Sequence, residues 1–158
     1  MNEKMNPKIK FMSEALREAR EGIAANHGGP FGSVIVLEDR IVGRGHNRVL
    51  LNRDATCHGE MEAIRDACRN LGTHDLSGCD LYTTAEPCPM CLGAILWANI
   101  RQVYYGCNVK DTEAIGFRDS RFYDYLAGAK GDPVLTELDR DRCLELFAEY
   151  GSVERPGY

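Results

Sequence analysis

The sequence predicts a three-layer α/β/α sandwich built around a central five-stranded mixed sheet. Short β-branched segments alternate with longer segments whose apolar residues recur every three or four positions, and this alternation is typical of helices packed on both faces of a sheet. The 158 residues are enough for one domain with a hydrophobic core, and no linker, repeat or low-complexity tract divides them. We therefore predict a single domain over residues 1–158.

The individual elements follow in order along the chain. Gly28-Gly29-Pro30 is expected to end the first helix, and a tight turn at Asp39-Arg40 is expected to join the first two strands. The segment 90–98 is apolar at almost every position, so we expect a buried helix there. The tail, 151–158, has no periodicity. The spacing of three or four residues between apolar positions predicts helices over 8–25, 58–70, 90–98, 120–127 and 139–150. The short β-branched segments predict strands over 33–38, 41–45, 79–84, 102–106 and 134–136.

Composition and charge narrow the class of protein. A net charge of -5 and a pI near 5.4 disfavour nucleic acid as a partner, because proteins that grip phosphates usually present a basic face. No apolar run approaches the roughly 20 residues that cross a bilayer, and Met1–Phe11 lacks the apolar stretch of a secretory signal. We therefore expect a cytoplasmic protein without a membrane partner. In a reducing compartment, its seven cysteines favour metal-binding or catalytic roles over disulfides.

Three residues have the chemistry of zinc ligands. His58, Cys88 and Cys91 offer one imidazole and two thiolates, and catalytic zinc sites use three protein ligands with one position left for water. Cys88 and Cys91 lie at the start of the apolar helix, whose free N–H groups and positive end stabilise thiolates. The pattern therefore predicts one zinc ion per chain.

Glu60 gives this metal site a catalytic character. It follows His58 by two residues at the start of the same helix, where a carboxylate can reach water at the metal without being a ligand. A histidine-x-glutamate pair followed by proline-cysteine-x-x-cysteine is the signature of zinc nucleobase deaminases. By itself, Cys88-x-x-Cys91 would also fit a redox pair or half of a structural site. A zinc-stabilised structural module is the alternative outside the enzymes, and Glu60 argues against it because a structural site does not need that carboxylate.

With these residues, the chain resembles the cytidine deaminase superfamily, in its cytosine, guanine and tRNA-adenosine deaminase branch. The resemblance runs over about residues 8–127. It implies a homodimer or a higher assembly, and it implies that Glu60 moves protons from water to the base and the departing amine. It also implies that Asn47, in Gly45-His46-Asn47, anchors the substrate and that Phe31 packs on the bound base. An asparagine at a strand end is also common in turns, and such a phenylalanine is often part of the core.

The resemblance points to two different bases. Gly59 stands where most of the superfamily has alanine, and with Gly-Arg-Gly-His-Asn at 43–47 it resembles fungal cytosine deaminases. The segment 114–120 resembles bacterial guanine deaminases instead. In those enzymes the residue matching Asp119 helps to hold the purine, and a C-terminal tyrosine, here Tyr158, closes the pocket, often from the partner subunit.

Three substrates follow in order of preference. Guanine, or a related aminopurine or triazine, comes first, because its N1–H and 2-amino group suit an acidic acceptor such as Asp119. Cytosine comes second, and tRNA adenosine comes third because the chain is acidic. Arg118 stands where guanine deaminases carry an acid. Asp119 would also fit as the cap of a helix beginning near Ser120, and Tyr158 would also fit as a disordered end that leaves 151–158 without a lid role.

Overall fold

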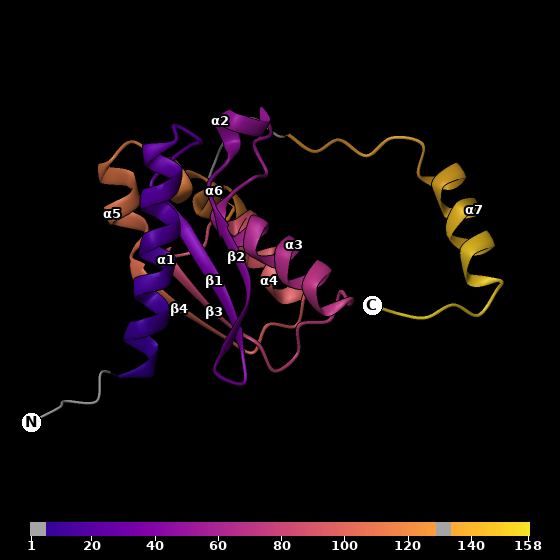
Figure 1. Ribbon diagram of the computed structural model, residues 1–158. Coiled ribbons are helices and arrows are strands. Elements are labelled where there is room, and N and C mark those ends of the chain that lie inside the picture. Colours follow the sequence, from indigo (N-terminus) through magenta and orange to yellow (C-terminus); the bar gives the residue numbers. More distant parts are fainter. Residues whose placement is uncertain (1–5, 129–133) are drawn as a thin grey trace, which may run out of the picture.

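The computed structural model describes residues 6–128 and 134–158 of the protein. A mixed sheet forms its centre (Figure 1), with the strand order β2-β1-β3-β4. β1 pairs antiparallel with both β2 and β3, whereas β3 and β4 are parallel. The four strands are β1 (Gly32–Leu37), β2 (Arg40–His46), β3 (Asp80–Ala85) and β4 (Gln102–Cys107).

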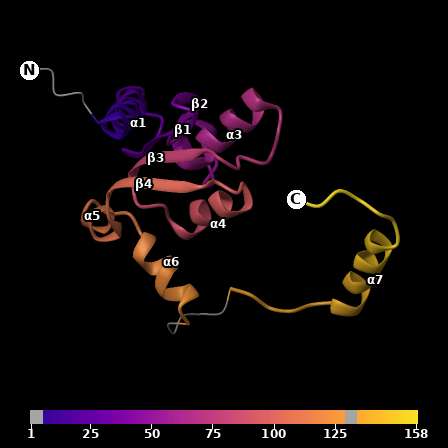
Figure 2. The same ribbon diagram turned by 90° about the horizontal axis from the view of Figure 1, so that it is seen from below.

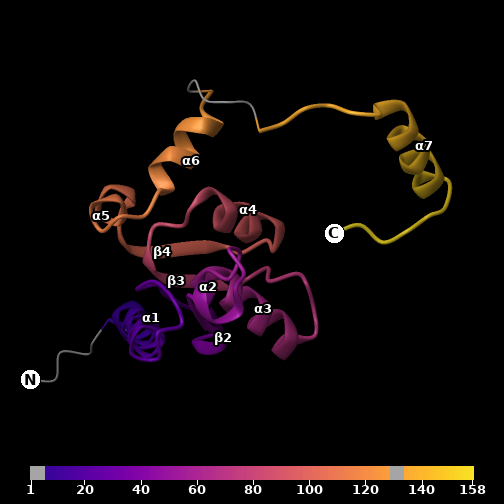
Figure 3. The same cartoon turned by 90° about the horizontal axis from the view of Figure 1, so that it is seen from above.

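Helices cover both faces of this sheet, which confirms the predicted three layers (Figure 3). α1 (Pro7–Ala24) packs through Phe11 on Val34, Val36 and Tyr82. On the opposite face, α3 (Gly59–Leu71) and α4 (Pro89–Trp97) enclose the larger part of the core. This part is formed by Ile35, Ala63, Ala67, Leu76, Cys79, Leu81, Ile95 and Ala98.

Local chemistry accounts for where these elements begin and turn. Pro7 occupies the first turn of α1, where no intrahelical bond needs its missing N–H, and the side chain of Asn6 caps the helix by accepting from the Lys8 N–H. The hairpin turn lies at Glu38 and Asp39, one residue earlier than expected. Both have positive φ, 47° and 61°, as the twist of a two-residue hairpin requires.

Close packing of α3 on β2 positions the start of α3. A Cβ atom on Gly43 would lie 2.5 Å from the Ala63 carbonyl oxygen, and one on Gly45 would lie 2.5 Å from the Ala63 nitrogen. Only glycine at these two positions lets the helix backbone approach the strand so closely. The approach fixes the end of α3 at which His58 and Glu60 lie.

Four further helices lie outside the three layers. The pair α2 and α5 is short and was not predicted, because neither helix is long enough to show a helical period. α5 is stabilised by a reciprocal cap between Asn108 and Asp111. The bounds are α2 (Val49–Asn52), α5 (Val109–Ala114), α6 (Asp119–Leu126) and α7 (Arg140–Gly151). No helix among the described residues combines the length and the apolar character needed to span a membrane.

Two expectations from the sequence are wrong. Residues 134–136 form no strand, and within the part of the chain that the structure describes the sheet has four strands instead of five. Val134 and Leu135 are each 81% exposed on a segment that leads away from the sheet (Figure 1), so no strand lies beside them to complete a ladder. α4 is also less buried than its composition suggested. Only one side of it packs on the core, and Leu96 and Trp97 on the outer side are 67% and 69% exposed.

Candidate active site

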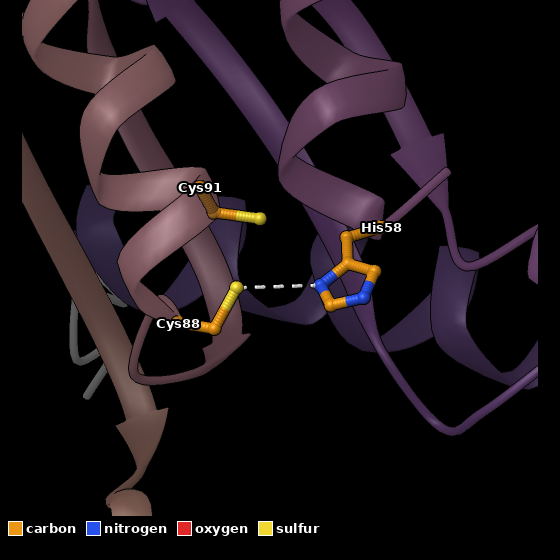
Figure 4. A group of neighbouring side chains, drawn as sticks. All are labelled: His58, Cys88 and Cys91. Carbon is orange, nitrogen blue, oxygen red and sulfur yellow. Dashed lines mark hydrogen bonds between the residues drawn. The ribbon is translucent and has the colours of Figure 1, made fainter. Parts of the chain in front are cut away.

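The two helices that cover one face of the sheet begin beside each other, and their first residues form a candidate metal centre. His58 occupies the N-cap position of α3, Cys88 occupies the N-cap position of α4, and Cys91 lies in the first turn of α4. Their side chains point toward one another (Figure 4), and one ligand atom from each lies within 4.8 Å of the other two. The structure thus brings together the three residues that the sequence pattern singled out as ligands.

The spacing of these atoms fits zinc. Tetrahedral zinc with bonds of about 2.3 Å to sulfur and about 2.0 Å to nitrogen separates a sulfur and a nitrogen ligand by about 3.6 Å. The distance from Cys88 Sγ to His58 Nδ1 is 3.5 Å. Cys57, although next to His58, is buried away from this group and is contacted by Asn52 and Arg65. The donor set is therefore two sulfurs and one imidazole nitrogen.

The two thiols divide one negative charge between them. A hydrogen bond from Cys91, with a further contribution from His58, lowers the pKa of Cys88 to about 4. The same interaction with Cys88 raises the pKa of Cys91, and burial raises it further. The hydrogen bond to Cys88 also raises the pKa of His58. A cation bound between these side chains would favour the ionised form of both thiols.

Glu60 lies in the first turn of α3, next to the candidate ligands. Its side chain is buried, and its Oε2 atom lies 3.5 Å from Cys91 Sγ. Its Oε1 atom accepts a hydrogen bond from the Thr83 hydroxyl at 3.3 Å. Burial raises the pKa of Glu60 above its usual value, since a desolvated carboxylate is costly. A carboxylate in this position can take up and return a proton.

The loop before β1 and the loop after β2 meet beside the start of α3. Asn47 donates its backbone N–H to the Phe31 carbonyl oxygen at 2.9 Å, and its Oδ1 atom accepts from the Val49 N–H at 3.1 Å. Phe31 is half-buried and packs edge-on against Phe117, with ring centroids 4.8 Å apart. The Phe31 carbonyl in turn lies against Gly59, directly between His58 and Glu60. Asn47 and Phe31 thus belong to the same continuous site as the metal ligands.

Asp119 approaches the metal centre from α6. It is half-buried, and its pKa is raised mainly by burial and further by the Cys88 thiolate, so its carboxylate lies near the candidate ligands. Tyr123, one turn further along α6, donates its hydroxyl to the Pro87 carbonyl oxygen and so ties this helix to the segment that carries Cys88. The sequence did not assign that role to Tyr123, because the contact joins residues far apart along the chain.

A cavity opens next to the ligands. It has a volume of about 310 Å³, which is within the range of small-molecule sites. Its walls are largely apolar and come from the start of α4 and one side of α6. The lining residues are His58, Cys88, Pro89, Met90, Phe122, Tyr125 and Leu126.

Tyr158 is not brought to this site within one chain. It is 84% exposed, and its ring lies 6.0 Å from Trp97 and 6.1 Å from His74, measured between centroids. Trp97 ends α4, whereas Cys88 precedes its first residue, so the tyrosine lies at the wrong end of the helix to cover its own metal centre. A lid formed by the last residues of the same chain does not follow from this arrangement.

Two groups of buried polar side chains near the site were not predicted from the sequence. One is the pair Ser33 and Thr83, which leads to Glu60. The other ties the Asn47 loop to α1: His46 Nε2 lies 2.8 Å from His27 Nδ1, and His46 Nδ1 lies 3.2 Å from Glu18 Oε2. His46 directly precedes Asn47 in the sequence and was expected to be structural, but its partners could not be predicted from that position.

Comparison with known proteins agrees with the geometry. Residues 5–107 match the cytidine and deoxycytidylate deaminase zinc-binding region. Guanine deaminase of Bacillus subtilis is 48% identical over 113 residues, which cover 72% of each chain. A crystal structure of guanine deaminase from Bacillus subtilis superposes with a TM-score of 0.87 at 36% identity, covering 100% of this chain and 99% of the other.

Two further relatives bear on the substrate. The tRNA-specific adenosine deaminase of Agrobacterium fabrum is 45% identical over 102 residues, or 65% of this chain and 66% of the relative. A structure solved in complex with 2,6-diaminopurine superposes with a TM-score of 0.67 at 34% identity, covering 97% of this chain and 85% of the other.

A sheet with two helix starts that present a histidine, two cysteines and a buried glutamate defines a zinc-dependent deaminase, an enzyme that hydrolyses C–N bonds of nucleobases. The chain belongs to the cytidine and deoxycytidylate deaminase family.

Proposed function

We propose that the protein deaminates guanine, or a closely related aminopurine, with water to give the oxo base and ammonia; for guanine the product is xanthine. The observation that carries this proposal is the extent of the likeness. The guanine deaminase structure covers the whole chain, including α6 and the tail, whereas a structure from studies of tRNA:A34 deaminases covers 65% of it at a TM-score of 0.63. The bound 2,6-diaminopurine of another relative is also a purine.

The residues divide into those that hold the base and those that act on it. Asn47 offers an amide that can donate to and accept from a base edge, and Phe31 offers a ring face for stacking. Asp119, which is half-buried near the ligands, supplies an acceptor for an N–H group of guanine.

His58, Cys88 and Cys91 would hold one zinc ion per chain, as their spacing and chemistry allow. When bound, zinc acts as a Lewis acid and makes water a nucleophile near neutral pH. Glu60 would accept the first proton that water loses and give it to the ring nitrogen as the oxygen adds to the carbon. It would then move the second proton from the added hydroxyl to the departing amine, so that the oxo base forms and ammonia leaves. Its burial suits this role, because burial raises the pKa of Glu60 and so favours proton uptake.

The substrate is tested by comparing the kcat/KM values of the zinc-loaded protein for guanine, cytosine and a tRNA anticodon stem-loop, measured as ammonia release. We expect guanine to have the highest value. A higher value for cytosine would favour the fungal-type alternative, and a higher value for the stem-loop would favour tRNA adenosine deamination. Ammonia from none of the three, with zinc bound, would overturn the proposal.

Replacing Gly28 by alanine is expected to reduce activity by displacing Asn47. A Cβ atom at this position would lie 2.0 Å from Asn47 Oδ1 and 3.0 Å from the Asn47 carbonyl oxygen, so the amide has to leave its place. Loss of one substrate hydrogen bond corresponds to a roughly tenfold lower kcat/KM.

Gly93→Ala in α4 is the matched control, because no atom lies within 4 Å of a Cβ at that position. It should keep the kcat/KM value for guanine. Equal activities of the two variants would contradict the role of Asn47.

The tail leads us to propose a homodimer in which each chain packs its tail on the other. α7 extends away from the sheet (Figure 2), and its described residues are all exposed although Leu144, Leu146 and Phe147 are apolar. The outer side of α4 and the free edge of β4 offer apolar and hydrogen-bonding surface that a second copy could cover. Tyr158 of each chain would then close the site of the other chain.

Phe147→Asp is expected to convert the dimer to a monomer, because it places a charge in the apolar side of α7, where Phe147 is 71% exposed in one chain. Light scattering should give twice the chain mass of 17.6 kDa for the unmodified protein and the single mass for the variant, with lower guanine turnover. Glu149→Gln on the same helix should keep the dimer. A monomeric, fully active unmodified protein would contradict the exchange of tails.

A further inference from the structure

We propose that Ser33 and Thr83 are positioning residues for Glu60, forming a buried chain of hydroxyl groups that orients its carboxylate toward the metal centre. The Ser33 Oγ atom lies 2.9 Å from Thr83 Oγ1, and Thr83 Oγ1 lies 3.3 Å from Glu60 Oε1. This inference rests on the proposed role of Glu60 as the proton carrier. It concerns the orientation of that side chain and not its protonation.

The sheet itself places the two hydroxyl groups together. Ser33 on β1 and Thr83 on β3 are directly paired in the antiparallel ladder, so their side chains leave the sheet on the same face. That face carries α3, whose first turn contains Glu60. All three side chains are buried, with exposed fractions of 0%, 1% and 5% in the order given. No solvent is therefore needed to complete the chain.

The donor and acceptor pattern gives the chain a direction. An ionised carboxylate only accepts, so the single hydroxyl proton of Thr83 must be donated to Glu60. The oxygen of Thr83 then accepts from Ser33, which fixes the rotation of the Thr83 hydroxyl. With Oε1 held in this way, Oε2 is left on the side of Cys91, from which it is 3.5 Å distant. Oε1 of Glu60 is thus held by Thr83, while Oε2 lies toward the metal ligands.

Gly59 makes room for this arrangement. A Cβ atom there would lie 3.3 Å from Ser33 Oγ and 3.1 Å from the Phe31 carbonyl oxygen, which is tighter than ordinary contact. The absence of a side chain between His58 and Glu60 lets the serine hydroxyl sit directly beside the start of α3. Gly59 and Ser33 therefore act as a pair.

The length of the second bond sets the size of the effect. At 3.3 Å it is longer than the roughly 2.7 Å of a strong O–H···O bond, so Thr83 contributes orientation more than charge stabilisation. Misplacement of a reacting group by about 1 Å can cost about 100-fold in rate, so a smaller displacement should cost about 10-fold or more. We expect a loss of this order in kcat without a change in KM, because neither hydroxyl belongs to the surface that binds the base.

The experiment compares Thr83→Val, Thr83→Ser and Ser33→Ala as full-length, zinc-loaded proteins with guanine, or with whichever base the protein turns over. Thr83→Val keeps the shape and removes the donor, so kcat should fall about 10-fold or more at constant KM and zinc content. Thr83→Ser restores the hydroxyl and should recover most of the activity. Ser33→Ala leaves Thr83 in place but frees its rotation, and it should lose a few-fold in kcat.

Thr112→Val is the matched control, since Thr112 is an equally buried threonine whose hydroxyl bonds only the Asn108 carbonyl oxygen in α5. It should keep kcat. Thr83→Val with unchanged kcat, or Thr83→Ser as impaired as Thr83→Val, would overturn the proposal while leaving the role of Glu60 intact if Glu60→Gln is inactive. If Thr83→Val does not fold, Ser33→Ala decides, and unchanged kcat in that variant overturns the proposal.

Discussion

Replacing Glu60 by glutamine is expected to abolish turnover while zinc stays bound. Glutamine has nearly the same shape and can still accept the Thr83 hydrogen bond at Oε1, so the first turn of α3 should remain in place. It cannot take up a proton, and general acid–base groups contribute about 10²- to 10⁴-fold to such reactions. The measurement is kcat for ammonia release at matched zinc content.

Glu62→Gln is a suitable companion variant. Glu62 lies on the same turn of α3, but its carboxylate pairs with Arg65 at 2.6 Å and does not belong to the ligand group. Its loss should leave kcat nearly unchanged. If Glu60→Gln retained full activity with zinc bound, another group would have to carry the proton.

Removing the Cys91 thiol is expected to empty the metal centre. Cys91 is fully buried, and alanine there leaves only His58 and Cys88, which is one ligand fewer than a catalytic zinc site uses. Changes to residues that merely support metal ligands already weaken zinc binding about 10- to 100-fold, so loss of a ligand should exceed that. Elemental analysis after dialysis should find the zinc content and the ammonia release reduced together.

Cys107→Ser provides the comparison, because this thiol is exposed at the end of β4 and is not part of the ligand group. It should bind zinc as the unmodified protein does. A Cys91→Ala variant that retained one zinc ion per chain would contradict the assignment of the ligands.

The layers and the ligand group were predictable because they depend on short-range signals. Helical and strand periods located α1, α3, α4, α6 and the four strands to within a residue or two. The ligand residues follow from spacing within two helix starts, and the packing of those helices on one face of the sheet brings them together. The sequence pattern carries this information directly.

Contacts between distant segments were not predictable in the same way. The chain from Ser33 through Thr83 to Glu60 joins two strands and a helix, and nothing in the local sequence of any of them indicates the register that pairs Ser33 with Thr83. The contact of Tyr123 with the Pro87 carbonyl depends likewise on how α6 returns to the sheet.

The helix α7 was predicted to within one residue, but the strand expected over 134–136 was not found, because a strand depends on more than its own pattern. Residues 134–136 have the β-branched and apolar character of a strand, but a strand forms only where another strand is available to pair with it. The burial of α4 was mispredicted for a similar reason. An apolar helix is expected to be covered, but its sequence does not show whether the same chain or another molecule covers it.

The most direct test of the account is the mass balance for guanine incubated with the zinc-loaded protein. One xanthine and one ammonia should appear for each guanine consumed, and Glu60→Gln at the same zinc content should form neither. Guanine that remains unchanged under conditions where another base releases ammonia would contradict the proposed substrate. Ammonia formed equally by both proteins would contradict the chemistry assigned to the site.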